Sequence, residues 1–460
     1  MLLNHILSAW RNFRKGKIIS AINLTGLILG VAFCIMILQW VKDEKRVDAF
    51  HHHTARIYNV YEREFADGKV VHDYSTPGLL ATELKKKIPE VEYAAVFDRN
   101  SEITLQAGEK NIKYDGLYAN EDFLKVLTFP LLRGNKDDVL KDASSMIISK
   151  KAALSFFGSV EKAVGQSIRV MDRDNFLVSG VFDDVPDNSS LKFDYVINWH
   201  VFMQQNPWFN DFGNTAPFTT ILLKDNANTD NVKSKIKNFL KDYEVGEGPG
   251  YRLELDMQRY DEQYLYSNFK DGYIAGGRIE YVRLFSIVAI FVLLIACINF
   301  MNLSTARSLK RAKEIGVRKV IGANKRALIF QFISEALFLS FLAVIAAGIL
   351  VQLCLPAFNS LTGKNISLDL KASSFWIELF TIAVVSGLLA GVYPAWYISS
   401  FDPVKAIKGN LKFRLNAVLF RKGLIVFQFT LSILFVVLTL VVSKQVKYIQ
   451  NRNSNAYMHH

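Results

Sequence analysis

The stretch AKEIGVRKVIGANKRAL (Ala312–Leu328) lies between two of the most apolar runs of the chain and holds five lysines and arginines but a single acid. An apolar run of roughly 20 residues is long enough to cross about 30 Å of hydrocarbon as a helix. The basic stretch is therefore interpreted as a turn between two membrane spans.

Five apolar runs of this kind occur in the 460 residues, half of which are hydrophobic. The first run lacks the small-residue cleavage site of a signal peptide, so it is interpreted as a retained anchor. The predicted spans cover residues 18–41, 281–304, 327–355, 375–398 and 424–443.

A long polar insert, residues 42–280, separates the first two spans and has ordinary globular composition. Segments 55–65, 175–185 and 218–225 are rich in β-branched and aromatic residues and predict strands, whereas 230–243 has helical periodicity after an aspartate cap. The predicted fold is a membrane protein: an α-helical transmembrane bundle with a large α+β extracytoplasmic domain inserted between the first and second spans.

The distribution of charge predicts which side faces the cytoplasm. Segments 1–17, 305–326 and 399–423 together carry 18 lysines and arginines against two acids, Glu314 and Asp402, in a chain whose net charge is +12. By the positive-inside rule these segments are cytoplasmic and the large domain is outside. Because the positive charge is juxtamembrane, it indicates contact with membrane lipid and no binding of nucleic acid.

The first 17 residues predict an amphipathic elbow helix in the membrane interface, because apolar residues recur at helical spacing. These residues are Leu3, Ile6, Leu7, Trp10 and Phe13.

Motifs for chemistry are absent from the sequence. The three Gly-Lys pairs lack the following Ser or Thr and the upstream glycine of a phosphate-binding loop, so no cofactor is expected in this chain. His51, His52 and His53, with His72, are interpreted as a satisfied surface cluster, because no metal-ligand spacing accompanies them. No catalytic residue and no metal ligand is predicted, and the chain is not expected to be an enzyme.

Glu335 is an ionisable residue inside the third apolar run. It lies about two turns from Ala327, near the predicted cytoplasmic end. Capping or hydrogen bonding to the elbow is therefore favoured over a proton relay.

Segment 305–321 predicts a short helix on the cytoplasmic surface, with a narrow apolar strip formed by Leu309, Ala312, Ile315 or Gly316, and Val320. It could lie on lipid or insert into a groove of another protein. Gly316, Gly322 and Ala323 favour the groove, because small residues permit close backbone approach.

Several segments resemble known sequences. Asn302–Leu337, with Glu314-Ile315-Gly316, Arg318-Lys319 and Gly322-Ala323, is similar to the coupling segment of MacB/FtsX-like ABC transporter permeases. Gly391–Gly409, with Pro394 and Pro403, resembles the exit of that family's last span. Residues 11–34 resemble the amino-terminal anchor of the large Bacteroidota-type members of this family. Residues 157–168 and 178–195 resemble the outer core domain of the same members.

The resemblance implies a permease of the mechanotransmission type. A separate cytoplasmic ABC ATPase dimer, which holds ATP and magnesium, would grip the coupling segment and move the outer domain, for export or envelope transport. The implied ATPase-coupling residues are Arg311, Glu314, Ile315, Gly316, Arg318, Lys319, Gly322 and Ala323, and the implied elbow or loop residues are Glu335, Pro394 and Pro403.

The last span and the residues after it, 424–460, resemble the start of a second copy of the unit, so a truncated second extracytoplasmic domain is expected at 444–460. The resemblance implies a second permease half or a homodimer partner, with further periplasmic or outer-membrane components. An alternative is a membrane receptor that senses an envelope-stress ligand or antimicrobial peptide. A membrane-anchored outer enzyme is the third and weakest hypothesis.

Overall fold

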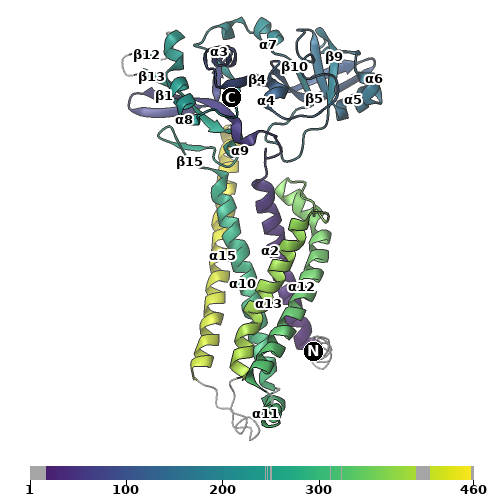
Figure 1. Ribbon diagram of the computed structural model, residues 1–460, viewed down its shortest axis with the longest axis vertical. Helices are drawn as coiled ribbons and strands as arrows, with labels where there is room; N and C mark the ends of the chain where they lie inside the picture. The colour runs from purple at the N-terminus through teal and green to yellow at the C-terminus, as the bar shows by residue number, and fades with distance from the viewer. Residues whose placement is uncertain are drawn as a thin grey trace. The chain divides into compact units, whose positions relative to one another are not determined.

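The computed structural model describes residues 17–243, 245, 247–248, 251–310, 312–322, 324–399 and 415–456 (Figure 1). The chain forms two compact units. Residues 42–283 make up one, and the segments before and after them make up the other.

The second unit is a bundle of long helices, in which helices that follow one another in the chain run in opposite directions (Figure 1). Its helices are α2 (Lys17–Glu44), α10 (Arg278–Lys310), α11 (Ala312–Val320), α12 (Lys325–Thr362), α13 (Ser373–Ser399) and α15 (Leu415–Ala456). Within the described residues, five are long and apolar enough to cross a membrane, over Ala21–Glu44, Arg278–Ala306, Lys325–Thr362, Ser373–Tyr397 and Lys422–Val441.

Helix ends differ from the sequence prediction in three places. The predicted surface helix does not begin at Thr305, because α10 continues without a break to Lys310 and only Ala312–Val320 forms a separate helix. Residues 415–423, predicted as loop, already belong to α15. Residues 444–456 continue α15. Charged residues end an apolar run but do not end a helix, so hydropathy placed these boundaries wrongly.

Small residues bring the helices of the bundle close together. Gly26 and Gly30 of α2 face α10, and a Cβ at Gly30 would collide with Ala296. Gly387 and Gly391 of α13 face α12 in the same way, with a Cβ at Gly391 falling 2.6 Å from that of Ala336. Both pairs have the glycine spacing that lets membrane helices approach closely.

Buried polar groups in the bundle bond across helices. Ser340 of α12 donates to the Ala383 carbonyl of α13 over 2.8 Å, and its hydroxyl lies 2.6 Å from that of Ser386. The Gln39 amide of α2 donates to the carboxylate of Glu378 on α13, at 3.2 Å and 3.3 Å. Such bonds hold particular helix pairs together where apolar packing alone would not select a partner.

The other unit is built on a 13-stranded mixed sheet. Its main path runs β12-β13-β1-β11-β4-β5-β10-β7-β9-β6; β2 pairs with β1, β3 with β11, and β8 with β4 and β9. The strands are β1 (Ile57–Ala66), β2 (Lys69–Asp73), β3 (Ser75–Pro77), β4 (Val91–Ala107), β5 (Lys110–Ala119), β6 (Leu131–Arg133), β7 (Ser145–Ser149), β8 (Ser167–Val170), β9 (Asp174–Phe182), β10 (Tyr195–Asn198), β11 (Thr215–Leu223), β12 (Glu247–Gly248) and β13 (Tyr251–Arg259), with β14 (Asn268–Lys270) and β15 (Tyr273–Gly276) as a separate hairpin.

Short helices cover the sheet. They are η1 (Thr54–Arg56), α3 (Leu80–Lys87), α4 (Phe123–Val126), α5 (Lys150–Phe157), α6 (Val160–Ala163), α7 (Trp199–Gln205), η2 (Pro207–Asn210), α8 (Thr229–Lys237), η3 (Phe239–Tyr243) and α9 (Tyr260–Gln263). Two apolar clusters form the core. One includes Leu84 and Ile236, and the other includes Phe123 and Phe193. The segments predicted as strands contain most of β1, β9 and β11, and the predicted helix contains most of α8 and all of η3.

Glu62 on β1 is a buried carboxyl group, and its Oε1 has no hydrogen-bond partner. It lies opposite Asp73 of β2. Burial, followed by the charges of Asp73 and Glu64, raises its pKa from 4.5 to about 8. A raised folded-state pKa means that Glu62 favours folding at low pH, and that this contribution is lost as the pH rises through about 8.

We therefore expect Glu62→Gln, which cannot ionise, to stabilise the chain above pH 8 and to change little at pH 5. The Tm at pH 9 should rise by at least about 2–4 °C, which is the shift that about 1 kcal/mol gives in a domain of this size. Thermal unfolding of the detergent-purified chain measures it, with exposed Glu109→Gln as the control. An equal shift at both pH values would contradict the assignment.

Candidate functional site: the helix between the second and third spans

Helix α11 lies at the end of the bundle where α12 begins and α13 ends (Figure 1). The turn from α11 to α12 includes Gly322, whose φ of +103° lies in the region that favours glycine. Its N–H donates to the Lys319 carbonyl over 3.1 Å and closes the end of α11. The glycine is thus required by the turn itself, and an added Cβ would meet no atom within 4 Å.

One side of α11 is packed against its neighbours. Ile315 is buried in a small apolar cluster with Leu328 and Phe332 of α12 and with Ala395 and Tyr397 of α13. Gly316 is buried as well. The cluster fixes the inner side of α11 to two spans at once.

Two cations of α11 bond to the same two spans. The Arg318 guanidinium donates to the Gln331 side-chain oxygen of α12 over 3.3 Å. The Lys319 ammonium donates to the Ser399 carbonyl over 2.6 Å, at the last residue of α13. A cation at the C-terminal carbonyls of a helix is favoured by the helix dipole. Both bonds strengthen the attachment of α11 to the bundle.

The opposite side of α11 and its turn is apolar and exposed. Val317, Val320 and Ile321 are 46%, 64% and 80% exposed, and we call these three residues the α11 patch. Their spacing of three and four residues places them on one face. A short helix therefore presents an apolar face outward while its inner face is fixed.

Two family models match the chain. A MacB-like periplasmic core domain matches residues 20–239, and an FtsX-like permease C-terminal domain matches residues 286–403. The second match contains α11 together with the two spans that hold it. The chain belongs to the MacB/FtsX-like ABC transporter permeases.

Curated relatives of this permease are named as export proteins. A pyoverdine export ATP-binding/permease protein of Pseudomonas syringae pv. tomato is 25% identical over 88% of this chain and 59% of its own length. A macrolide export ATP-binding/permease protein of Campylobacter jejuni subsp. jejuni is 23% identical over 87% of this chain and 60% of its own length. The chain thus spans about 60% of the length of these two relatives.

A solved structure similar to this permease is the periplasmic region of MacB from Actinobacillus actinomycetemcomitans, with 16% identity and a TM-score of 0.31. The match covers 42% of this chain and 87% of that structure.

The coupling residues predicted in the permease fall in different environments. Ile315 and Gly316 face the bundle, Arg318 and Lys319 bond to it, and Gly322 forms the turn. Glu314 lies within α11. Arg311, Ala323 and Pro403 lie outside the described residues.

Two of the predicted elbow or loop residues, Pro394 and Glu335, lie inside helices. Pro394 is buried inside α13, which continues to Ser399. The helix turn around Pro394 supplies Ala395 and Tyr397 to the cluster against α11. Glu335 is half-buried within α12.

The sequence interpretation placed Ile315 and Val320 on one apolar strip, but the structure separates them. Ile315 is buried at 4% exposure, whereas Val320 faces outward. Val317 and Ile321 were not singled out, although their spacing with Val320 was visible in the sequence. A helix this short can turn either apolar edge inward, so periodicity could not decide between the two.

His51 and His72 lie in different environments. His51 is buried, where its ring contacts Phe129 and Tyr260 and its Nδ1 accepts from the Thr128 N–H over 2.9 Å. Burial lowers its pKa to about 4. The interpretation of His51 as a surface residue is therefore wrong, while His72 stacks on Phe269. Among the described residues no three His, Cys, Asp or Glu side chains could hold a metal together.

We expect Lys319→Met to loosen α11 from α13. The substitution removes the donor to the Ser399 carbonyl, a charged hydrogen bond of roughly 1.5 kcal/mol or more, equivalent to about ten-fold. Hydrogen exchange in the last turn of α13 should accelerate by about that factor. Lys371→Met, an exposed lysine in the loop at the far end of α12 and α13, is the control. Unchanged exchange at Ser399 would show that the bond contributes nothing.

Proposed function

We propose that this permease is the membrane subunit of an ABC transporter of the mechanotransmission type, in which a separate cytoplasmic ATPase dimer docks on the α11 patch. The supporting observation is that Val317, Val320 and Ile321 stay exposed while the other side of α11 is fixed to α12 and α13. An apolar face on a short helix suits insertion into a groove of a partner protein. A helix held on one side can transmit force received on the other.

Movement of α11 would pass into α10, which ends at Lys310, two residues before α11 begins. Helix α10 packs on α2 through the glycines at 26 and 30. In sequence, α2 leads into the unit formed by residues 42–283, which we call the outer unit, and α10 follows it. These two packed helices are therefore the covalent route by which ATP-driven motion would reach the outer unit, so that a substrate need not pass between the spans.

The proposed orientation follows the charge. The basic segments, the amino terminus and α11 face the cytoplasm, and the outer unit faces the periplasm of a bacterium with this protein in its inner membrane. The match to a periplasmic core domain supports this orientation. ATP and magnesium would bind to the partner ATPase, and a second permease half or a second copy of this chain would complete the assembly, with periplasmic or outer-membrane components as further partners.

Export or envelope transport is the proposed outcome, as the relatives' names suggest. Purification of the tagged chain from its native host in mild detergent tests the proposal. We expect a nucleotide-binding subunit to co-purify in stoichiometric amount and to hydrolyse ATP. Purified chain with no ATPase would instead support the receptor alternative.

A further inference from the structure

A groove of about 570 Å³ runs between α12 and α13 on the face that they turn away from the bundle. Helix α12 contributes Phe341, Ile345 and Ile349, and α13 contributes Trp376 and Phe380. Ile345, Ile349, Trp376 and Phe380 are more than half exposed. Both helices are apolar enough to cross a membrane, where hydrocarbon chains would reach this groove.

The length of the groove matches one leaflet of a bilayer. From Phe341 to Gln352 the groove extends over twelve residues of α12, and the eleven rises between them make about 16 Å at 1.5 Å each. Half of the hydrocarbon core is about 15 Å thick. The groove therefore has room for an extended acyl chain of one leaflet, on the side of the loop that joins α12 to α13.

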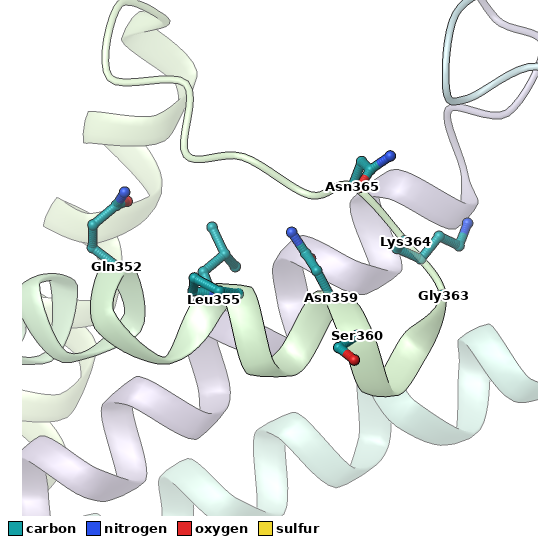
Figure 2. Close-up of a pocket in the computed structure, with 8 residues that line it drawn as sticks. Gln352, Leu355, Asn359, Ser360, Gly363, Lys364 and Asn365 are labelled. Carbon is teal, nitrogen blue, oxygen red and sulfur yellow. The ribbon is translucent and has the colours of Figure 1, made fainter.

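The loop end of the groove is polar. Gln352 lines both the groove and a second pocket of about 520 Å³. Figure 2 shows Gln352, Leu355 and Asn359 pointing from α12 toward the loop that carries Asn365. Asn359 fixes this loop, because its amide donates to the Ile366 carbonyl over 2.9 Å and accepts from the Ile366 N–H over 3.2 Å.

One basic side chain lies at the polar end. Lys364 lines the pocket, and no carboxylate lines either the pocket or the groove within the described part of the chain. The amides of Gln352 and Asn365 add hydrogen-bond donors. An apolar slot of leaflet length that ends in amides and a lysine has the chemistry of a phospholipid site, with the phosphate at the polar end.

We propose that this groove retains one anionic glycerophospholipid, with an acyl chain between α12 and α13 and the headgroup beside Lys364. A helix from a second copy is the competing occupant. A helix, about 10 Å in diameter, would cover the apolar groove. Unlike a phospholipid, it would bring no phosphate to the polar pocket. The site does not rest on the ATPase proposal, because it lies at the end of α12 away from α11.

Gly348 is a position where a larger side chain should fill the groove without disturbing the packing of the helices. It lines the groove, and a Cβ added there would meet no atom within 4 Å. Gly348→Leu therefore projects into the groove without a clash inside the protein. Gly423 of α15 is also a helical glycine with nothing within 4 Å of an added Cβ, so Gly423→Leu is a matched control outside the groove.

The test is native mass spectrometry of the full chain in mild detergent with equimolar palmitoyl-oleoyl phosphatidylglycerol and phosphatidylethanolamine. We expect one retained lipid per chain, with phosphatidylglycerol preferred. Gly348→Leu should reduce its occupancy about ten-fold, whereas Gly423→Leu should not. Lys364→Gln should remove most of the preference for phosphatidylglycerol while lipid is still retained.

Three results would overturn the proposal: no retained lipid, equal loss in Gly348→Leu and Gly423→Leu, or equal retention of the two headgroups by the unmodified chain. A dimer that Gly348→Leu converts to monomer would assign the groove to a second copy. Capture of the ATPase is expected to be unchanged in Gly348→Leu, which separates a failure here from a failure of the ATPase proposal.

Discussion

Val320→Glu in the α11 patch should abolish co-purification of the ATPase. Val320 is exposed, so the substitution leaves the buried cluster around Ile315 intact and the chain should fold normally. A carboxylate placed in an apolar docking groove loses its hydration without gaining a partner, which costs several kcal/mol and weakens binding by at least about a hundred-fold. Pull-down from detergent, quantified against the purified chain, measures the loss.

Leu419→Glu is the matched control. Leu419 is an exposed apolar residue of α15 that precedes the span Lys422–Val441, and it belongs to a predicted cytoplasmic segment outside α11. The same change there should leave ATPase capture within about two-fold, since the exposed Leu419 side chain lies outside α11 and its turn. If both variants capture the ATPase equally well, the α11 patch is not the docking face.

Gly391→Leu should disrupt the pairing of α12 with α13. A single Cβ at this position would already fall 2.6 Å from that of Ala336, and a Cβ at Gly387 would fall 3.0 Å from the Leu337 Cα. Leucine adds three further carbons, so the helices must separate. Separation would strain the bonds from Ser340 to Ala383 and Ser386. Overpacking of this kind typically costs 1–3 kcal/mol, to which loss of these bonds would add roughly 1 kcal/mol.

The measurement is thermal unfolding and size-exclusion behaviour of the purified chain in detergent. Gly391→Leu should lower the unfolding temperature or yield aggregated protein, whereas Gly423→Leu, with open space around it, should behave as the unmodified chain. The unfolding temperature of Gly391→Ala should lie between those of Gly391→Leu and the unmodified chain. A Gly391→Leu chain as stable as Gly423→Leu would mean that the small-residue contact is unimportant.

Local signals in the sequence account for most of the helical unit. The structure places a long helix through each of the five apolar runs, because hydrophobicity over about 20 residues is a local property of the chain. The short segments around β1, β11 and α8 were also visible, since β-branched residues and an aspartate near a helix start act within a few residues.

The strand order of the sheet and the packing of α11 depend on contacts between residues that are distant in the chain. The order β13-β1-β11-β4 pairs residues more than 120 positions apart in the chain, and no local pattern encodes it. The same reason applies to the site. Which edge of α11 faces inward is decided by Phe332 and Tyr397 on two other helices. The Lys319 ammonium, predicted to contact the ATPase, bonds to the Ser399 carbonyl 80 residues away, which no local pattern indicates.

Site-specific photo-cross-linking from position 321 tests the central claim most directly. Ile321 is the most exposed member of the α11 patch, so a photoreactive residue there would reach a docked partner without disturbing the bundle. Irradiation of whole cells is predicted to join the chain to a nucleotide-binding subunit, and Val320→Glu in the same chain should remove that product. Cross-links to lipid alone, or labelling of Ile321→Cys by an impermeant thiol reagent added outside the cell, would contradict the account.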